Sequence, residues 1–139
     1  MTETTGEGGT AWGSRAARAT VEAYWAAANA RDWGAFAATL TDDVVYDLPQ
    51  SRERVIGKER YVRFSRAGSE DRHVRIERIV ADGEGGGAAA RTTVLAGPQE
   101  LSAVHFFRFD AGGRITGVTD VWPERYEPPA DREHLTERY

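Results

Sequence analysis

The chain has 139 residues and no cysteine, so we expect one domain without disulfides, thiolate nucleophiles or cysteine metal sites. Its net charge of −4 argues against nucleic acid or an anionic membrane as the main partner, because both require a basic surface. No window approaches the ~18 apolar residues of a membrane span, and the N-terminus lacks the basic and apolar regions of a signal peptide. We therefore expect a cytoplasmic location.

The first half of the chain carries helical patterns. Residues 1–13 are rich in Thr, Gly and Glu, and we expect them to be a disordered leader before a domain over 14–125. Ser14 is a candidate N-cap for a helix that runs to about Ala30, with apolar residues at helical spacing. Asp32 is expected to cap a second, short helix, and a third helix is expected to begin around Gly57.

The second half alternates with the period of β-strands. Long strands are expected near residues 73–82, 88–95, 101–109 and 114–122, after a short strand at 44–48 and a polar loop at 50–56. Helices followed by a meander of strands favour an α+β fold, with a curved antiparallel sheet and helices packed on one face. Residues 126–139 are charged and proline-rich and are expected to form a C-terminal tail.

The last two strands bring a candidate acid/base pair together. A turn over residues 110–113 would place His105 opposite Val118 and make Asp120 its diagonal neighbour, with Cβ atoms roughly 7 Å apart. An imidazole and a carboxylate can meet at that distance, directly or through water. Because side chains alternate across a strand, the face that holds this pair also holds aromatic residues. We therefore expect a site here.

The opposite face of this hairpin is also apolar. It carries Val104, Phe106, Ile115 and Val121. The helices of the chain can cover one face of the sheet. A second copy of the protein is the simplest cover for the other, because closed two-fold dimers are the commonest soluble assemblies. We therefore predict a homodimer through the sheet; the alternative is that other strands or the tail cover this face.

Several short motifs, in this order, resemble a known family. They are Tyr24-Trp25, Asp32, Asp42-Asp43-Val44-Val45, Gly57-Lys58-Glu59, Phe64, Phe107-Arg108-Phe109-Asp110 with Gly113-Arg114-Ile115, and Asp120-Val121-Trp122. They resemble the SnoaL-like branch of the nuclear transport factor 2-like superfamily, which also includes ketosteroid isomerase, scytalone dehydratase and limonene epoxide hydrolase. The resemblance covers about residues 15–125. It implies a cone-shaped α+β fold, with three N-terminal helices on a strongly curved, mixed or antiparallel sheet that encloses a pocket, usually as a homodimer.

The resemblance also implies roles for single residues. Against ketosteroid isomerase, Tyr24 falls on the oxyanion-hole tyrosine, Phe64 on a pocket phenylalanine and His105 on the oxyanion aspartate. The position of the isomerase's catalytic base holds Leu48, so that route of proton transfer is not expected. Against SnoaL-type polyketide cyclases, His105 and Asp120 resemble the histidine and the acid/base aspartate of the last two strands.

The chemistry implied is general acid/base catalysis on a carbon acid, with no metal or organic cofactor required. Asp120 would act as the acid/base, while His105 and Tyr24 would polarise or position the substrate. The expected walls of the pocket are Leu48, Phe64, Phe107, Val118 and Trp122. The expected ligand is a small apolar or carbonyl-bearing molecule, and the reaction a cyclisation or an isomerisation.

Other interpretations stay open. His105 and Asp120 can be a buried structural pair, and the protein a non-catalytic ligand-binding or dimerisation module of the same fold. Epoxide hydrolysis or dehydration is a further alternative, and epoxide opening would need Arg91 to point inward. Arg52, in the loop after the first strand, could attract an anionic substrate, although a solvated loop explains it as well. The histidines lack the spacing of metal ligands, so no metal site is expected.

Overall fold

The computed structural model describes the backbone of residues 2–84 and 86–139 and the side chains of residues 13–84 and 86–139. The helices are α1 (Thr2–Ala30), α2 (Trp33–Ala38), α3 (Lys58–Ala67) and a 3-10 helix, η1 (Ala130–Leu135). The strands are β1 (Leu40–Leu48), β2 (Glu53–Ile56), β3 (Arg72–Asp82), β4 (Gly87–Ala96), β5 (Gln99–Phe109) and β6 (Ile115–Val121). Within the described ranges, no helix is long and apolar enough to cross a membrane.

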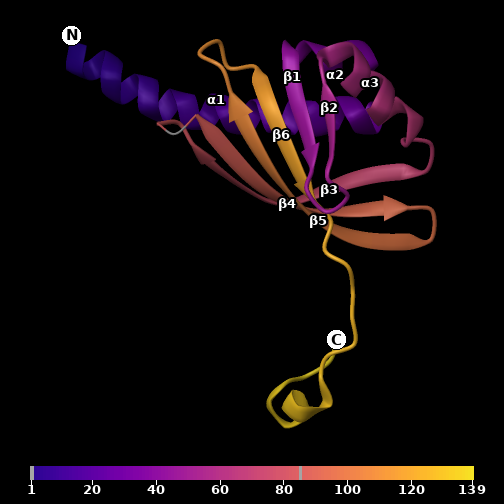
Figure 1. Ribbon diagram of the computed structural model, residues 1–139. Helices are drawn as coiled ribbons and strands as arrows, with labels where there is room; N and C mark the ends of the chain where they lie inside the picture. The colour runs from indigo at the N-terminus through magenta and orange to yellow at the C-terminus, as the bar shows by residue number, and fades with distance from the viewer. Residues whose placement is uncertain (1, 85) are drawn as a thin grey trace.

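One curled sheet contains all six strands, in the order β2-β1-β6-β5-β4-β3. β1 and β6 are parallel, and the other neighbouring strands are antiparallel. Figure 1 shows α1, α2 and α3 on one side of the sheet, while the chain after β6 leads away from it. The sheet does not close on itself, so its concave face needs the helices as a cover. The expected α+β cone is therefore confirmed.

The core lies between the helices and the concave face. On α1, Ala17, Val21, Tyr24 and Trp25 are buried at helical spacing, as the apolar stripe predicts. They pack against alternating residues of the strands and against α2. The largest apolar side chains that are fully buried are Phe36, Phe107, Leu40, Ile115, Val21, Val44, Val94 and Val118.

Two helix starts test the predicted caps. Asp32 caps α2 as expected, because its Oδ1 accepts a hydrogen bond from the Ala35 amide at 3.1 Å. The expected start of α1 at Ser14 is wrong, since the helix begins at Thr2. The Ser14 hydroxyl instead accepts a hydrogen bond from the Gly83 amide at 3.0 Å, so it ties the helix to the end of β3. The side chains of the expected leader lie outside the described residues up to position 12.

The region expected as a polar loop at 50–56 contains a strand. β2 pairs antiparallel with β1 at the sheet edge, from Val45 opposite Ile56 to Leu48 opposite Glu53. Its residues are mostly exposed, so the sequence shows no apolar alternation there. Backbone pairing with β1, rather than burial, defines this strand.

The β5–β6 register differs from the predicted one by two residues. His105 lies directly opposite Asp120, and Phe107 opposite Val118. The turn closes between Asp110 and Arg114 instead of between Asp110 and Gly113, because the Asp110 amide donates to the Arg114 carbonyl, and a β-bulge between Arg108 and Phe109 shifts the register by one further residue. An even shift keeps the same side chains on the same face, so the expected pair forms in a closer geometry.

The bulge also moves Ile115 from the face on which it was expected. Ile115 lies opposite Phe109, is fully buried and belongs to the core. The other residues expected on the outer face keep their place there. Phe106, with 51% of its surface exposed, is the most accessible large side chain among them.

Candidate functional site

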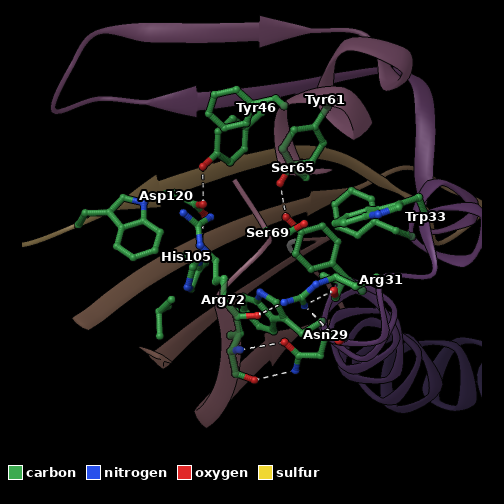
Figure 2. Close-up of a pocket in the computed structure, with 18 residues that line it drawn as sticks. Asn29, Arg31, Trp33, Tyr46, Tyr61, Ser65, Ser69, Arg72, His105 and Asp120 are labelled. Atoms are coloured by element: carbon green, nitrogen blue, oxygen red, sulfur yellow. Dashed lines mark hydrogen bonds and ion pairs between the residues drawn. The ribbon is translucent and has the colours of Figure 1, made fainter. Parts of the chain in front are cut away.

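A pocket opens between the helices and the concave face of the sheet. It has a volume of about 80 Å³. Buried side chains of α1, β1, α3, β5 and β6 form its floor, and Figure 2 shows Tyr46, Asp120 and His105 close together there. The main floor residues are Tyr24, Trp25, Tyr46, Tyr61, His105 and Asp120. The pocket is therefore lined by aromatic rings around one acid and one imidazole.

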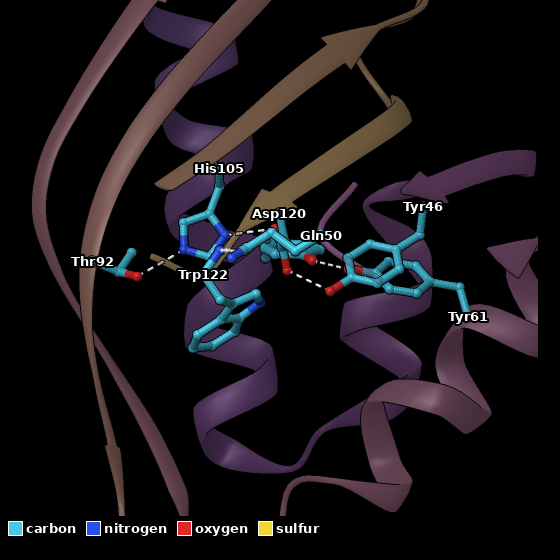
Figure 3. Close-up of polar contacts among 8 residues, drawn as sticks. Tyr46, Gln50, Tyr61, Thr92, His105, Asp120 and Trp122 are labelled. Carbon is cyan, nitrogen blue, oxygen red and sulfur yellow. Dashed lines mark hydrogen bonds and ion pairs between the residues drawn. The ribbon is translucent and has the colours of Figure 1, made fainter. Parts of the chain in front are cut away.

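Four polar side chains form a hydrogen-bonded chain across the floor (Figure 3). His105 Nδ1 lies 2.6 Å from Asp120 Oδ1, and His105 Nε2 lies 2.7 Å from the Thr92 hydroxyl. The Tyr46 hydroxyl donates to Asp120 Oδ2 at 2.6 Å. All four residues are buried, so their polar groups depend on one another rather than on solvent.

This geometry fixes the carboxylate and leaves it with unused capacity. An ionised carboxylate has about four lone-pair sites, and His105 and Tyr46 occupy two of those of Asp120. Asp120 also lines the pocket, with 7% of its surface exposed. The structure thus holds a carboxylate in one orientation and still lets it meet a small molecule.

A second pair of hydroxyls lies beside this chain. Tyr24 on α1 and Tyr61 on α3 share a hydrogen bond between their hydroxyl oxygens. The Tyr61 ring stacks on Tyr46 with centroids 4.5 Å apart, which joins the two groups. Whichever phenol donates within the pair, one hydroxyl hydrogen remains, and both phenols line the pocket. The pair can therefore donate one hydrogen bond to a ligand.

Burial keeps these phenols protonated. Desolvation raises the pKa of Tyr24 and Tyr46 far above the ordinary 10.0, and the negative charge of Asp120 adds to both effects. Desolvation is also the first cause of the raised pKa of Tyr61, followed by the charges of its neighbours. The three tyrosines are therefore hydrogen-bond donors at neutral pH, and none of them serves as a base.

Indole rings enclose the imidazole. Trp25 meets the His105 ring edge-on at a centroid distance of 4.7 Å, and Trp122 does so at 6.4 Å. Both indoles line the pocket. They exclude water from the imidazole and limit its rotation.

The structure brings most of the predicted site residues to this pocket. His105, Asp120, Tyr24, Phe64 and Trp122 line it, Phe64 at the exposed rim. His105 is bonded through both ring nitrogens, so it holds Asp120 in place rather than facing a ligand with a free donor. Tyr24 meets Tyr61 rather than the His105–Asp120 pair.

Three predicted wall residues lie elsewhere. Phe107 and Val118 are at most 2% exposed and belong to the core rather than to the pocket lining. Leu48 lines a separate hollow of about 710 Å³. Asp120 and Trp122 belong to the walls of both cavities, so they separate the hollow from the pocket.

Sequence reasoning did not identify Tyr46, Tyr61 and Thr92 as site residues. A signal existed for Tyr46, because it lies two positions before Leu48 and alternation puts both on the inner face of β1. Tyr61 lies on the buried face of α3, where an aromatic residue is typical of the core. Thr92 offered no signal beyond its place in a strand, since its contact with His105 depends on the β4–β5 register.

The arginines weighed in the sequence do not reach the pocket. Arg91 is exposed and lies opposite Val104, on the outer face of the sheet, so the inward arginine required for epoxide opening is not Arg91. Arg52 lines a separate surface hollow near Asp47. Within the described residues, no group of three or more His, Cys, Asp or Glu side chains is placed to hold a metal ion.

Comparison with known proteins gives a consistent picture. The SnoaL-like domain matches residues 21–118. A proposed ketosteroid isomerase from Kribbella flavida is 40% identical, with a TM-score of 0.85 and 91% of each chain covered. A proposed polyketide cyclase from Pseudomonas putida is 33% identical over 73% of this chain and 86% of its own, with a TM-score of 0.61. An epoxide hydrolase from M. tuberculosis is 28% identical over 79% and 84%, with a TM-score of 0.66. No curated protein matches.

Proposed function

The chain belongs to the SnoaL-like family, whose NTF2-like fold binds small-molecule substrates. We propose that it is a cofactor-independent enzyme that transfers a proton from one atom of a small carbonyl compound to another. The observation that carries this proposal is the placement of Asp120. Its carboxylate lines the pocket, is held by His105 and Tyr46, and retains lone pairs for a ligand. A carboxylate held in this way suits general acid/base catalysis.

The proposed step starts with the Asp120 carboxylate and the carbon next to a ligand carbonyl. Asp120 takes a proton from this carbon, and the electron pair of the broken C–H bond forms the carbon–carbon double bond of an enolate. The negative charge moves to the carbonyl oxygen, which accepts the remaining hydroxyl hydrogen of the Tyr24–Tyr61 pair as a hydrogen bond. In a β,γ-unsaturated ketone the enolate is conjugated with the carbon–carbon double bond, and return of the proton from Asp120 to the far carbon of that bond completes an isomerisation. In a dicarbonyl compound the enolate carbon instead attacks the second carbonyl carbon, and the oxygen of that carbonyl takes the proton back from Asp120, which completes a cyclisation.

His105 acts as a positioning residue in this scheme. Its Nδ1–H donates to Asp120, while Thr92 fixes the orientation of the ring from the other side. The two hydrogen bonds prevent rotation of the carboxylate away from the pocket. Phe64 and Trp122 form the apolar walls next to the reacting atoms.

Exchange of α-protons tests the proposed step without knowledge of the natural substrate. Cyclopentanone, incubated with the protein in D2O, should lose its α-proton NMR signals faster than in buffer alone. Asp120→Asn should lower the enzymatic rate about a hundredfold or more, which is typical of the loss of a general base. Asp43→Asn is the matched control, because Asp43 is exposed on β1 away from the pocket. Equal rates for wild type and Asp120→Asn would contradict the proposal.

A ligand-holding role without chemistry is the second candidate. It is favoured by one observation, namely that both oxygens of Asp120 and both nitrogens of His105 have protein partners. In that case, cyclopentanone would bind, as seen in NMR line broadening, without any acceleration of exchange. The exchange experiment therefore separates the two functions.

We also propose a homodimer through the outer face of the sheet. Val80, Ala89, Phe106 and Thr119 are register partners across β3, β4, β5 and β6, and they form a continuous row. Val80 and Phe106 are more than half exposed. An exposed, largely apolar row of this kind suits the two-fold contact of a dimer.

A further inference from the structure

The rim of the pocket carries a guanidinium group that no described residue neutralises. Arg72 begins β3, is exposed and lines the pocket (Figure 2). Within the described ranges, its side chain takes part in none of the ion pairs. An arginine offers a planar fork of donors that matches a carboxylate. Arg72 is thus equipped to bind an anionic group at the pocket mouth.

Contacts hold this side chain across the mouth. Its guanidinium carbon lies 5.8 Å from the centre of the Trp122 ring, within the range of a cation–π contact. On the other side it approaches Gly68, the residue that follows α3, where a Cβ atom would lie 3.5 Å from Arg72 Nη2. The guanidinium therefore spans the space between the end of α3 and the indole.

Arg31 also lines the pocket, but its guanidinium binds backbone carbonyl groups. Arg31 Nη1 donates to the carbonyls of Ala28 and Asn29 at 3.0 and 3.1 Å. Arg31 Nη2 donates to the Arg72 carbonyl at 2.6 Å, which fixes the backbone from which the Arg72 side chain starts. Arg31 thus satisfies backbone oxygens, and Arg72 remains the cation available to a ligand.

The positive charge of Arg72 has an electrostatic effect on the residues at the floor of the pocket. Burial is the main cause of the raised pKa of Tyr46, and the positive charge of Arg72 is the influence that opposes it. Among the described residues, Asp120 is the carboxylate that lines the pocket, and it repels a second negative charge nearby. An anionic group of a ligand is therefore favoured at the rim and disfavoured at the floor.

We propose that the pocket selects small oxo acids, with the ligand carbonyl next to Asp120 and the ligand carboxylate on Arg72. This assignment of substrate class rests on the proposed function for the position of the carbonyl group. A cavity of about 80 Å³ has room for a short chain, because one water-sized sphere needs roughly 10–15 Å³. Short oxo acids are therefore the fitting probes.

The experiment compares acids with neutral molecules of the same shape. The probes are 4-oxopentanoate and 5-oxohexanoate, each with its carboxamide, and affinity is measured by isothermal titration calorimetry. At least one acid should bind roughly 10- to 100-fold more tightly than its amide, as expected for hydrogen bonds to a charged group. Arg72→Gln should abolish the difference, whereas Arg72→Lys should keep part of it through its point charge. Arg78→Gln is the control, because Arg78 is exposed on the same strand.

The outcomes separate this proposal from the proposed function. Equal affinity for acid and amide, no binding of either acid, or a preference that survives Arg72→Gln would overturn the oxo acid proposal. An acid preference that depends on Arg72, found without any α-proton exchange, would support anion selection and contradict proton transfer. α-Proton exchange on cyclopentanone without a preference for the acids would support proton transfer and contradict anion selection. Circular dichroism of Arg72→Gln checks that this variant is folded. Arg72→Lys tests the role of the positive charge in a second variant.

Discussion

The Tyr46 hydroxyl donates a hydrogen bond of 2.6 Å to Asp120 Oδ2, and so connects β1 with the neighbouring parallel strand β6. Tyr46 pairs with Val118 in this ladder, and Asp120 lies two residues further along β6. The long side chain of Tyr46 therefore extends along the face of the sheet to meet the carboxylate. With His105 on the other oxygen, Asp120 is clamped from two strands. This clamp allows a buried charge to persist beside an apolar pocket.

Truncation of the imidazole should destabilise the fold more than neutralisation of the carboxylate. His105→Ala leaves Asp120 with one partner fewer in a buried place, which should cost on the order of 3 kcal/mol. Asp120→Asn keeps the shape and removes the desolvation cost of the charge, so we expect a small loss or a gain. Urea unfolding followed by circular dichroism measures both. Large losses in both variants would favour a structural pair over a functional one.

The three buried tyrosines should couple alkaline titration to unfolding. Burial raises the pKa of Tyr24, Tyr46 and Tyr61 above 10.0, so the folded state keeps protons that the unfolded state releases. The stability they contribute is fully present below pH 10 and falls as the pH rises further. Absorbance at 295 nm should show at most two of the five tyrosines ionised before circular dichroism reports unfolding. Ionisation of a third tyrosine in the folded protein would contradict this arrangement.

Removal of the Thr92 hydroxyl should be costly, although threonine and valine have similar shapes. Thr92→Val leaves His105 Nε2 without its partner in a buried place, which should destabilise the protein by about 1–3 kcal/mol. Thr93→Val is the matched control, because Thr93 is partly exposed and bonds to Glu77 on the surface. We expect a clearly smaller loss in the control, measured by urea unfolding. Equal losses would mean that the Thr92–His105 contact adds little.

The proposed dimer predicts a change in mass after one surface substitution. The wild-type chain should sediment at twice its 15.3 kDa mass at micromolar concentration. Phe106→Asp places a charge in the exposed row of the outer face and should give a monomer. Leu135→Asp, on η1, is the control for a large exposed apolar residue outside the sheet. A monomeric wild-type protein would exclude the dimer.

Local patterns predicted most of the elements of this fold, with β2 and the start of α1 as the exceptions. The Asp32 cap, the apolar stripe of α1 and the alternation of the long strands depend on a few neighbouring residues, and each is confirmed. The shared face of His105 and Asp120 was predictable for the same reason, because an even shift in register does not move a side chain to the other face.

The tertiary structure decided the contacts on which the proposed chemistry depends. The turn closed by Asp110 and Arg114 and the bulge between Arg108 and Phe109 together make Asp120 the direct neighbour of His105. The parallel pairing of β1 with β6 brings in Tyr46. Arg72 approaches Trp122 because the end of α3 and the start of β3 lie at the pocket mouth. Apart from Ile115, which the bulge moves to the inner face, the sequence by itself determined which side chains face inward, since strand and helix periods are local. Which of them meet depended on register and strand order, because both arise from packing between distant segments.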